Sequence, residues 1–166
     1  MIIDLTINYG GYDFISRKIA ERFAAKTTPS YSKYPADAPK ATAYKYQLTP
    51  HSKNNFTGPV YVMTSNITLS GGELLTMSLK SLPNVTHVGE TTRGALSDKL
   101  EKTLPNGWEI SLSNEVYLDH QGREFEGKGI PPDISIPVFD WNNLMNGHIE
   151  AINKLIKIVH GDLIKN

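Results

Sequence analysis

Cysteine is absent from this chain of 166 residues, which excludes disulfide bonds, thiolate nucleophiles and zinc sites built from thiolates. Net charge is absent as well: 17 basic side chains balance 17 acidic ones, so no overall field attracts nucleic acid or an anionic membrane surface. Apolar runs stay far below the roughly 20 residues that a membrane-spanning helix needs. No group of His, Asp and Glu residues has metal-ligand spacing. We therefore expect no metal or cofactor, no nucleic-acid partner and no membrane span.

The length and composition fit a single globular domain, because glycine and proline occur at ordinary frequencies and no internal repeat is visible. Over the first 90 residues the apolar spacing alternates between that of strands and that of helices. It predicts strands near 1–5, 60–63 and 85–90. It also predicts two amphipathic helices, at about 12–25 with Phe14, Ile15, Ile19 and Phe23 on the apolar face, and at about 70–82 with Leu74, Leu75, Leu79 and Leu82 inward. Strand, helix and strand in this order indicate right-handed parallel crossovers and an α/β core.

Two other regions have different patterns. Residues 27–57 are irregular, and only the alternation at 44–48 indicates a short strand there. Beyond residue 99, turn signals at 104–108 and 120–122 separate short strands, which predicts an antiparallel portion. Spaced isoleucines after Asn146-Gly147 predict a closing helix.

Ser70 is predicted to lie where a strand ends and a helix begins, followed by two flexible glycines. The free N–H groups and the positive dipole end of a first helical turn stabilise a developing oxyanion, so this is a favourable place for a nucleophile. The same residues also fit a simple capping box, in which Ser70 and Glu73 satisfy each other's backbone amides. Spacing alone favours the capping box, because this pattern is a common signal for the start of a helix.

Four segments in a fixed order strengthen the first interpretation: residues 2–11, 66–73, 88–94 and 126–133. Together they resemble the catalytic core of the C-terminal processing (tail-specific) serine peptidases, a family that includes the tricorn core and the repeats of the interphotoreceptor retinoid-binding protein. The resemblance implies a ClpP/crotonase-like spiral of strand-helix units with a short antiparallel C-terminal portion. In that family a further core segment, and often a PDZ-like domain, precedes the first strand. We therefore expect residues 1–166 to be one domain, the C-terminal part of a peptidase core.

The resemblance also implies site residues. Ser70 corresponds to the nucleophile, and the oxyanion donors correspond to the N–H of Gly71 and one N–H from Gly10 or Gly11. Without the resemblance, the preferred interpretation of Gly10-Gly11 is a tight strand-to-helix turn that needs positive φ. Arg93, which follows a neighbouring strand, is expected near the mouth of the same cleft, where its guanidinium suits a substrate carboxylate.

The base is missing from the sequence. One branch of the family uses a lysine at the position of Ala95, and neither Lys99 nor Lys102 replaces it by position. The tricorn-like branch uses a histidine that precedes the first strand of this chain, supported by a glutamate that corresponds to Glu126. An exposed loop carboxylate is the other interpretation of Glu126. The five histidines match no catalytic position and are expected to be structural or exposed.

These residues, together with the resemblance, predict a serine endopeptidase that binds an extended polypeptide by strand addition. Because the base is missing, we expect the isolated chain to be nearly inactive. A non-catalytic ligand- or peptide-binding module of the same fold is the alternative, and crotonase-type acyl-CoA chemistry a more distant one. The sequence does not determine the identity of the polypeptide substrate, and it leaves open whether the protein forms a homo-oligomer. The compartment is undetermined by composition, and the resemblance implies the cell envelope or secretion for the full-length parent.

Overall fold

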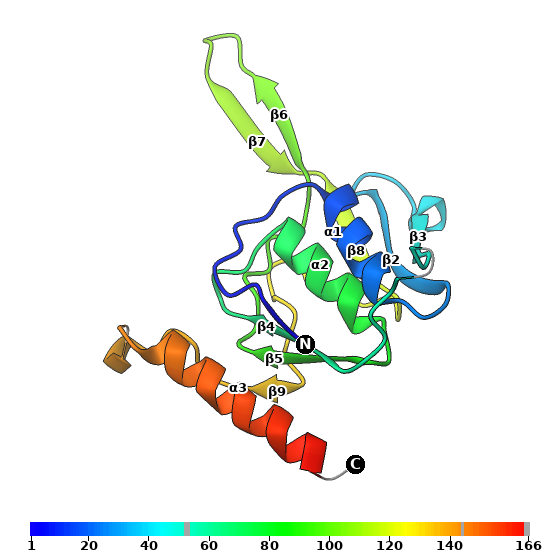
Figure 1. Ribbon diagram of the computed structural model, residues 1–166. Helices are drawn as coiled ribbons and strands as arrows, with labels where there is room; N and C mark the ends of the chain where they lie inside the picture. The colour runs from blue at the N-terminus through cyan, green and yellow to red at the C-terminus, as the bar shows by residue number, and fades with distance from the viewer. Residues whose placement is uncertain (52–53, 144, 165–166) are drawn as a thin grey trace.

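A computed structural model describes residues 1–51, 54–143 and 145–164. Strands and helices alternate in the first half, and strands dominate the second half until a long final helix (Figure 1). The elements are β1 (Ile2–Asp4), α1 (Asp13–Ala20), η1 (Glu21–Phe23), β2 (Thr28–Pro35), η2 (Lys40–Thr42), β3 (Tyr44–Leu48), β4 (Val60–Thr64), α2 (Gly71–Lys80), β5 (Val85–Gly89), β6 (Lys99–Thr103), β7 (Glu109–Ser113), β8 (Glu115–Asp119), β9 (Ile134–Ser135), η3 (Trp141–Asn143) and α3 (Gly147–Ile164).

A parallel sheet with the strand order β1-β4-β5-β9 forms the centre of the fold. Every residue of β4 is buried, and its side chains alternate between the two faces as a strand requires. Val60 and Val62 pack with residues of α1 and α2, whereas Tyr61 and Met63 pack with residues of α3. Helices on both faces of a parallel sheet confirm the predicted α/β core.

Helix α2 lies between the parallel sheet and a second, antiparallel sheet with the order β3-β2-β8 (Figure 1). Its residues from Gly71 to Leu79 are all buried, because Leu75 and Leu79 face the first core cluster while Leu74 and Met77 face Tyr31 and Tyr117. The predicted inward leucines are thus confirmed. A helix buried on all sides holds its first residue in a fixed position.

The apolar face predicted for the first helix is wrong at three of its four residues; only Phe23, in η1, is buried. Phe14, Ile15 and Ile19 are 55%, 51% and 40% exposed, and the helix instead turns Ser16 and Ala20 toward α2. The reason is close packing: Ser16 Oγ donates a hydrogen bond to the carbonyl of Gly71 at 2.7 Å, which only a small side chain allows.

Strands β6 and β7 form a hairpin that projects from the body of the protein, and all their residues are exposed (Figure 1). The antiparallel portion predicted after residue 99 is therefore confirmed. Strand β2, in contrast, falls in the region expected to be irregular. Within the described residues, no helix has both the length and the apolar composition needed to cross a membrane.

Candidate active site

Ser70 precedes α2 in a conformation that ordinary residues rarely adopt. Its φ of 52° and ψ of −122° make it the only residue other than glycine with positive φ in the described part of the chain. Such a conformation costs of the order of 1–3 kcal/mol and persists only where the surroundings impose it. A serine on a sharp strand-to-helix turn presents its hydroxyl outward, as catalytic serines on such turns do.

The turn at Gly10-Gly11 lies directly against Ser70. A Cβ on Gly10 would lie 2.8 Å from Ser70 Cβ and 3.1 Å from its Oγ, and a Cβ on Gly71 would lie 2.7 Å from the nitrogen of Gly11. Standard bond lengths then put the Gly10 nitrogen within about 6 Å of Ser70 Oγ. The two segments approach this closely because both lack side chains at the contact.

Two backbone N–H groups at this contact have no hydrogen-bond partner among the described residues, those of Gly71 and Gly11. The N–H of Gly10 is already engaged, because it donates to Asn8 Oδ1 at 2.9 Å. Of the two glycines in the turn, Gly11 is therefore the one with a free donor, while Gly10 provides the space for the serine.

Glu73 holds the start of α2 in place through more contacts than the capping box that the sequence indicated. The fully buried carboxylate accepts hydrogen bonds from four donors, namely Thr92 Oγ1 at 2.5 Å and the N–H groups of Gly94 at 2.7 Å, Ala95 at 2.8 Å and Ser70 at 3.2 Å. The last bond is one half of a capping box, whose other half pairs the Ser70 side chain with the N–H of Glu73. Only the Ser-x-x-Glu spacing pointed to this carboxylate, and it gave no sign of the partners at 92–95.

A surface cleft of about 570 Å³ opens over Ser70. Glu126 lines it and uses one carboxylate oxygen, Oε2, to accept the N–H groups of Leu96 at 2.8 Å and Ser97 at 2.9 Å. The other oxygen has no partner among the described residues. The remaining lining residues are Tyr9, Gly11, Tyr12, Leu69, Ala95, Ser97, Asp98, Lys99 and Ser113.

In the described part of the chain, no base contacts the serine. Within residues 1–51, 54–143 and 145–164, no histidine, lysine or carboxylate forms a hydrogen bond with Ser70 Oγ. Ala95 lines the cleft where one branch of the resembling family has a lysine, and Lys99 lines it as an exposed side chain. A base lysine needs a desolvated amine, and Lys99 lacks that environment.

The histidines lie elsewhere. His87 is fully buried in β5 with Nε2 2.7 Å from Thr64 Oγ1, and burial, followed by the nearby Lys80 charge, lowers its pKa to about 3. His148 contacts Asp4 at 2.8 Å, and His51 contacts Arg22 at 2.8 Å. The exposed His120 and His160 lie outside the cleft as well.

Arg93 does not line the cleft, although it is close in the chain to residues that do. Its N–H donates to the carbonyl of Thr68 at 2.9 Å, and its side chain is exposed without a hydrogen bond or ion pair to any described residue. Among the described residues, no group of three His, Asp or Glu side chains is arranged to hold a metal ion.

Comparison with known proteins identifies the fold and the family. Residues 1–136 match Peptidase family S41. The chain belongs to this family. The carboxy-terminal processing protease CtpB of Bacillus subtilis (strain 168) is 28% identical over 141 residues, which are 85% of this chain and 28% of that protein. CtpA of the same organism is 26% identical over 100 residues, 60% of this chain and 22% of that protein.

Solved structures of S41 peptidases and their relatives have the same fold. A chain from Parabacteroides merdae ATCC 43184 is 28% identical with a TM-score of 0.78, covering 93% of this chain and 50% of that one. Mature CPAF complexed with lactacystin, 16% identical, has a TM-score of 0.80 and covers 99% of this chain and 44% of that one, which shows the fold alone. This S41 chain therefore spans half or less of the relatives that it matches.

Proposed function

We propose that this chain is part of a serine endopeptidase that cleaves extended polypeptides, with Ser70 as the nucleophile. The observation that carries the proposal is the positive φ of Ser70 at the start of a buried helix, beside an unpartnered amide of Gly71. Strain of this kind concentrates at functional sites. Membership of family S41 supplies the reaction class, hydrolysis of a peptide bond by a serine peptidase.

In this mechanism the Ser70 hydroxyl attacks the carbonyl carbon, and the negative charge on the carbonyl oxygen is stabilised by two backbone donors, Gly71 and Gly11. Each such donor typically contributes two to three orders of magnitude to the rate. Gly10 contributes by having no side chain where Ser70 needs space. A substrate that adds as an extended strand presents its carbonyls at fixed intervals, and this positions one of them above the serine.

The base is proposed to be a histidine outside residues 1–166, oriented by Glu126. Support comes from the cleft: Glu126 lies in it with one oxygen bound to the loop amides and one oxygen unpartnered. A carboxylate held in this way on one side is suited to orient an imidazole or a water on the other.

A second candidate is a peptide-binding module of the same fold without catalysis. It is favoured by the absence of any base that contacts Ser70 within the described residues. In that case the serine serves only as the first residue of a capped helix.

The two candidates are separated by adding an external base. We expect the purified chain to hydrolyse unfolded casein very slowly or not at all, because an unassisted serine hydroxyl stays protonated near neutral pH. Neutral imidazole added to the buffer should accelerate the reaction of Ser70 with a fluorophosphonate, and the acceleration should increase with pH as imidazole loses its proton. Ser70→Ala should remove the labelling, whereas Ser113→Ala, another serine of the cleft, should retain it.

Two other results would change the conclusion. Rapid Ser70-dependent casein hydrolysis without imidazole would reveal a base within the chain, and Lys99 would be the first residue to replace. Absence of labelling even with imidazole, together with retained binding of casein, would favour the binding module.

A further inference from the structure

The two walls of the Ser70 cleft come from distant parts of the chain. One wall is the turn at 9–12, which runs directly into α1 at Asp13. The other wall is the segment 95–99, which runs into β6 and lies beside Ser113 at the end of β7. Gly11 belongs to the first wall, and Ser70 lines the cleft between the two.

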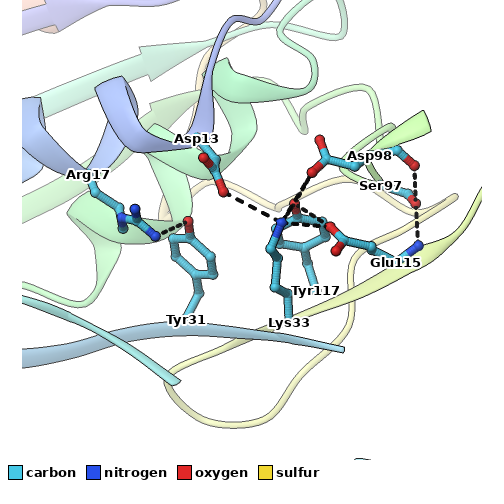
Figure 2. A network of polar contacts seen from close by, with 8 residues as sticks. All are labelled: Asp13, Arg17, Tyr31, Lys33, Ser97, Asp98, Glu115 and Tyr117. Carbon is cyan, nitrogen blue, oxygen red and sulfur yellow. Dashed lines mark hydrogen bonds and ion pairs between the residues drawn. The ribbon is translucent and has the colours of Figure 1, made fainter. Parts of the chain in front are cut away.

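Lys33 of β2 connects both walls, as Figure 2 shows. Its Nζ lies 3.7 Å from Asp13 Oδ2 on the first side and 3.2 Å from Asp98 Oδ2 on the second. Asp13 immediately follows Tyr12, and Asp98 lies between Ser97 and Lys99, so each carboxylate belongs to a segment that lines the cleft or adjoins it.

The same ammonium also holds the base of the hairpin. Lys33 donates to Glu115 Oε2 at 2.8 Å and to the hydroxyl of Tyr117 at 3.3 Å. The N–H of Glu115 donates to Ser97 Oγ at 3.1 Å, which ties the end of the hairpin back to the cleft wall (Figure 2). Both ends of the hairpin are therefore fixed at one point, although its length is exposed.

The cluster has one cation and three carboxylates, and the Lys33 side chain is only 16% exposed. Although burial lowers the pKa of Lys33, its hydrogen bonds to Glu115 and Asp98 raise it above the ordinary value. Burial raises the pKa of Asp98, but the hydrogen bond and charge of Lys33, together with the contacts to Glu115 and Tyr117, lower it overall. Lys33 therefore stays protonated and positively charged. A lysine that is already protonated cannot accept a proton from Ser70.

We propose that Lys33 is a positioning residue that sets the distance between the two walls of the Ser70 cleft. Without its ammonium, Asp13, Asp98 and Glu115 would repel one another without a counter-charge, and the walls would separate. The separation of the walls does not depend on what Ser70 does. A loss of Ser70 reactivity, in contrast, rests on the proposed function of Ser70 as a nucleophile. A displacement of about 1 Å at an oxyanion donor can cost roughly a hundredfold in rate.

Hydrogen exchange followed by NMR on the 166-residue chain tests the structural part. In Lys33→Met we expect protected amides of both walls, Gly10 on one side and Ala95, Leu96 and Ser97 on the other, to exchange roughly tenfold faster. Amides of β4 and β5 should be unchanged, and Lys33→Arg should restore the wild-type rates. Lys80→Met is the matched control, because Lys80 is also 16% exposed and paired with a carboxylate, Asp133 at 2.6 Å, but lies at the other end of α2.

Single-wall variants sharpen the test: Asp13→Asn should loosen only the first wall and Asp98→Asn only the second. Unchanged exchange in Lys33→Met, a change confined to one wall, or a uniform increase over the whole chain would overturn the proposal.

In the imidazole-assisted labelling assay, Lys33→Met should react about tenfold more slowly than wild type. Unaltered labelling in a variant whose walls exchange faster would refute the link to Ser70. Failure of wild type to label would instead refute the proposed function, and the exchange result would still decide the role of Lys33.

Discussion

A polar cluster lies at each end of α2, and the two clusters differ in whether their polar groups have hydrogen-bond partners within the protein. At the C-terminal end, Lys80, His87 and Asp133 lie together, and His87 also contacts the hydroxyl of Thr64. Histidine, lysine, carboxylate and hydroxyl are the usual components of a catalytic site, yet here His87 is fully buried and each group has a partner within the protein. At the N-terminal end, Ser70 is strained and two neighbouring amides lack partners among the described residues.

The difference teaches that function is better indicated by unsatisfied groups than by residue types. A buried cluster whose members satisfy one another is stable and has nothing left to offer a substrate. The cluster around Glu73 combines both properties, because a fully satisfied carboxylate holds a serine whose hydroxyl donates to no described residue. Substitutions at the two ends of α2 should therefore have different effects.

Glu73→Gln should have the largest effect on stability. The amide would place an NH2 group against N–H donors such as those of Gly94 and Ala95, leaving buried donors unpaired at a cost of about 2–4 kcal/mol. The change is measured as the free energy of unfolding in urea. Asp133→Asn at the other end is the comparison: its side chain is 50% exposed, and it should lose less than about 1 kcal/mol. Equal losses at the two ends would contradict the comparison.

Acid should weaken the C-terminal end first. The pKa of His87 is lowered to about 3, so folding favours its neutral form, and the stability this provides is present above the ordinary pKa of 6.5 and lost as pH falls below it. Between pH 6 and pH 4.5 the free energy of unfolding should decrease by up to about 1.4 kcal/mol per pH unit from this group. Above pH 4.5 the carboxylates with lowered pKa, such as Asp133, contribute little.

The slope of stability against pH, rather than its absolute value, is the measurement. His87→Gln should flatten the slope in this window even if the variant is less stable at every pH. His120→Gln, which changes an exposed histidine, should keep the wild-type slope. A slope that survives the loss of His87 would show that another group is responsible.

Ser70→Gly should stabilise the protein while removing its hydroxyl. Glycine adopts positive φ without strain, so relief of the Ser70 conformation should add about 1 kcal/mol to the free energy of unfolding, against a few tenths lost from capping. Ser70→Ala is the matched control, because alanine also lacks the hydroxyl but keeps the Cβ and its strain. Equal stability of the two variants would show that the conformation of Ser70 stores no strain.

Much of the N-terminal end of α2 could be predicted from the sequence, because the relevant signals are local. The leucines of α2, the adjoining strands and the serine before two glycines all lie within one continuous segment, and their positions are confirmed. The catalytic roles of Ser70, Gly71, Gly11 and Glu126 remain predictions.

What the sequence missed depends on contacts between distant segments. Glu73 binds backbone N–H groups at 94–95, which leave no trace in the identity of those residues. Lys33 meets carboxylates 20 or more residues away on either side. Strand β2 was missed because its polar sequence is stabilised by pairing with β3 and β8 rather than by local preference.

Replacement of Arg93 should have the smallest effect of these substitutions. It tests whether the cleft at the N-terminal end of α2 binds the C-terminus of a peptide. Arg93 and Ala95 are both exposed, and Ala95, two residues further along the chain, lines the cleft. Its guanidinium has no hydrogen bond or ion pair to any described residue and is free to bind a carboxylate.

In a Ser70→Ala background, which prevents cleavage, Arg93→Ala should weaken binding of a fluorescent peptide with a free C-terminus about fivefold, an exposed ion pair being worth about 1 kcal/mol. Binding of the same peptide with an amidated C-terminus should stay unchanged, and so should both affinities in Arg123→Ala, whose guanidinium is engaged by Asp119 at 2.7 Å. High salt should reduce the difference between the two peptides, because exposed charges are screened. If Arg93→Ala weakens the binding of both peptides equally, Arg93 contributes to binding without recognising the terminal carboxylate. The cleft at the N-terminal end of α2 would then bind internal segments of a polypeptide as readily as its C-terminus.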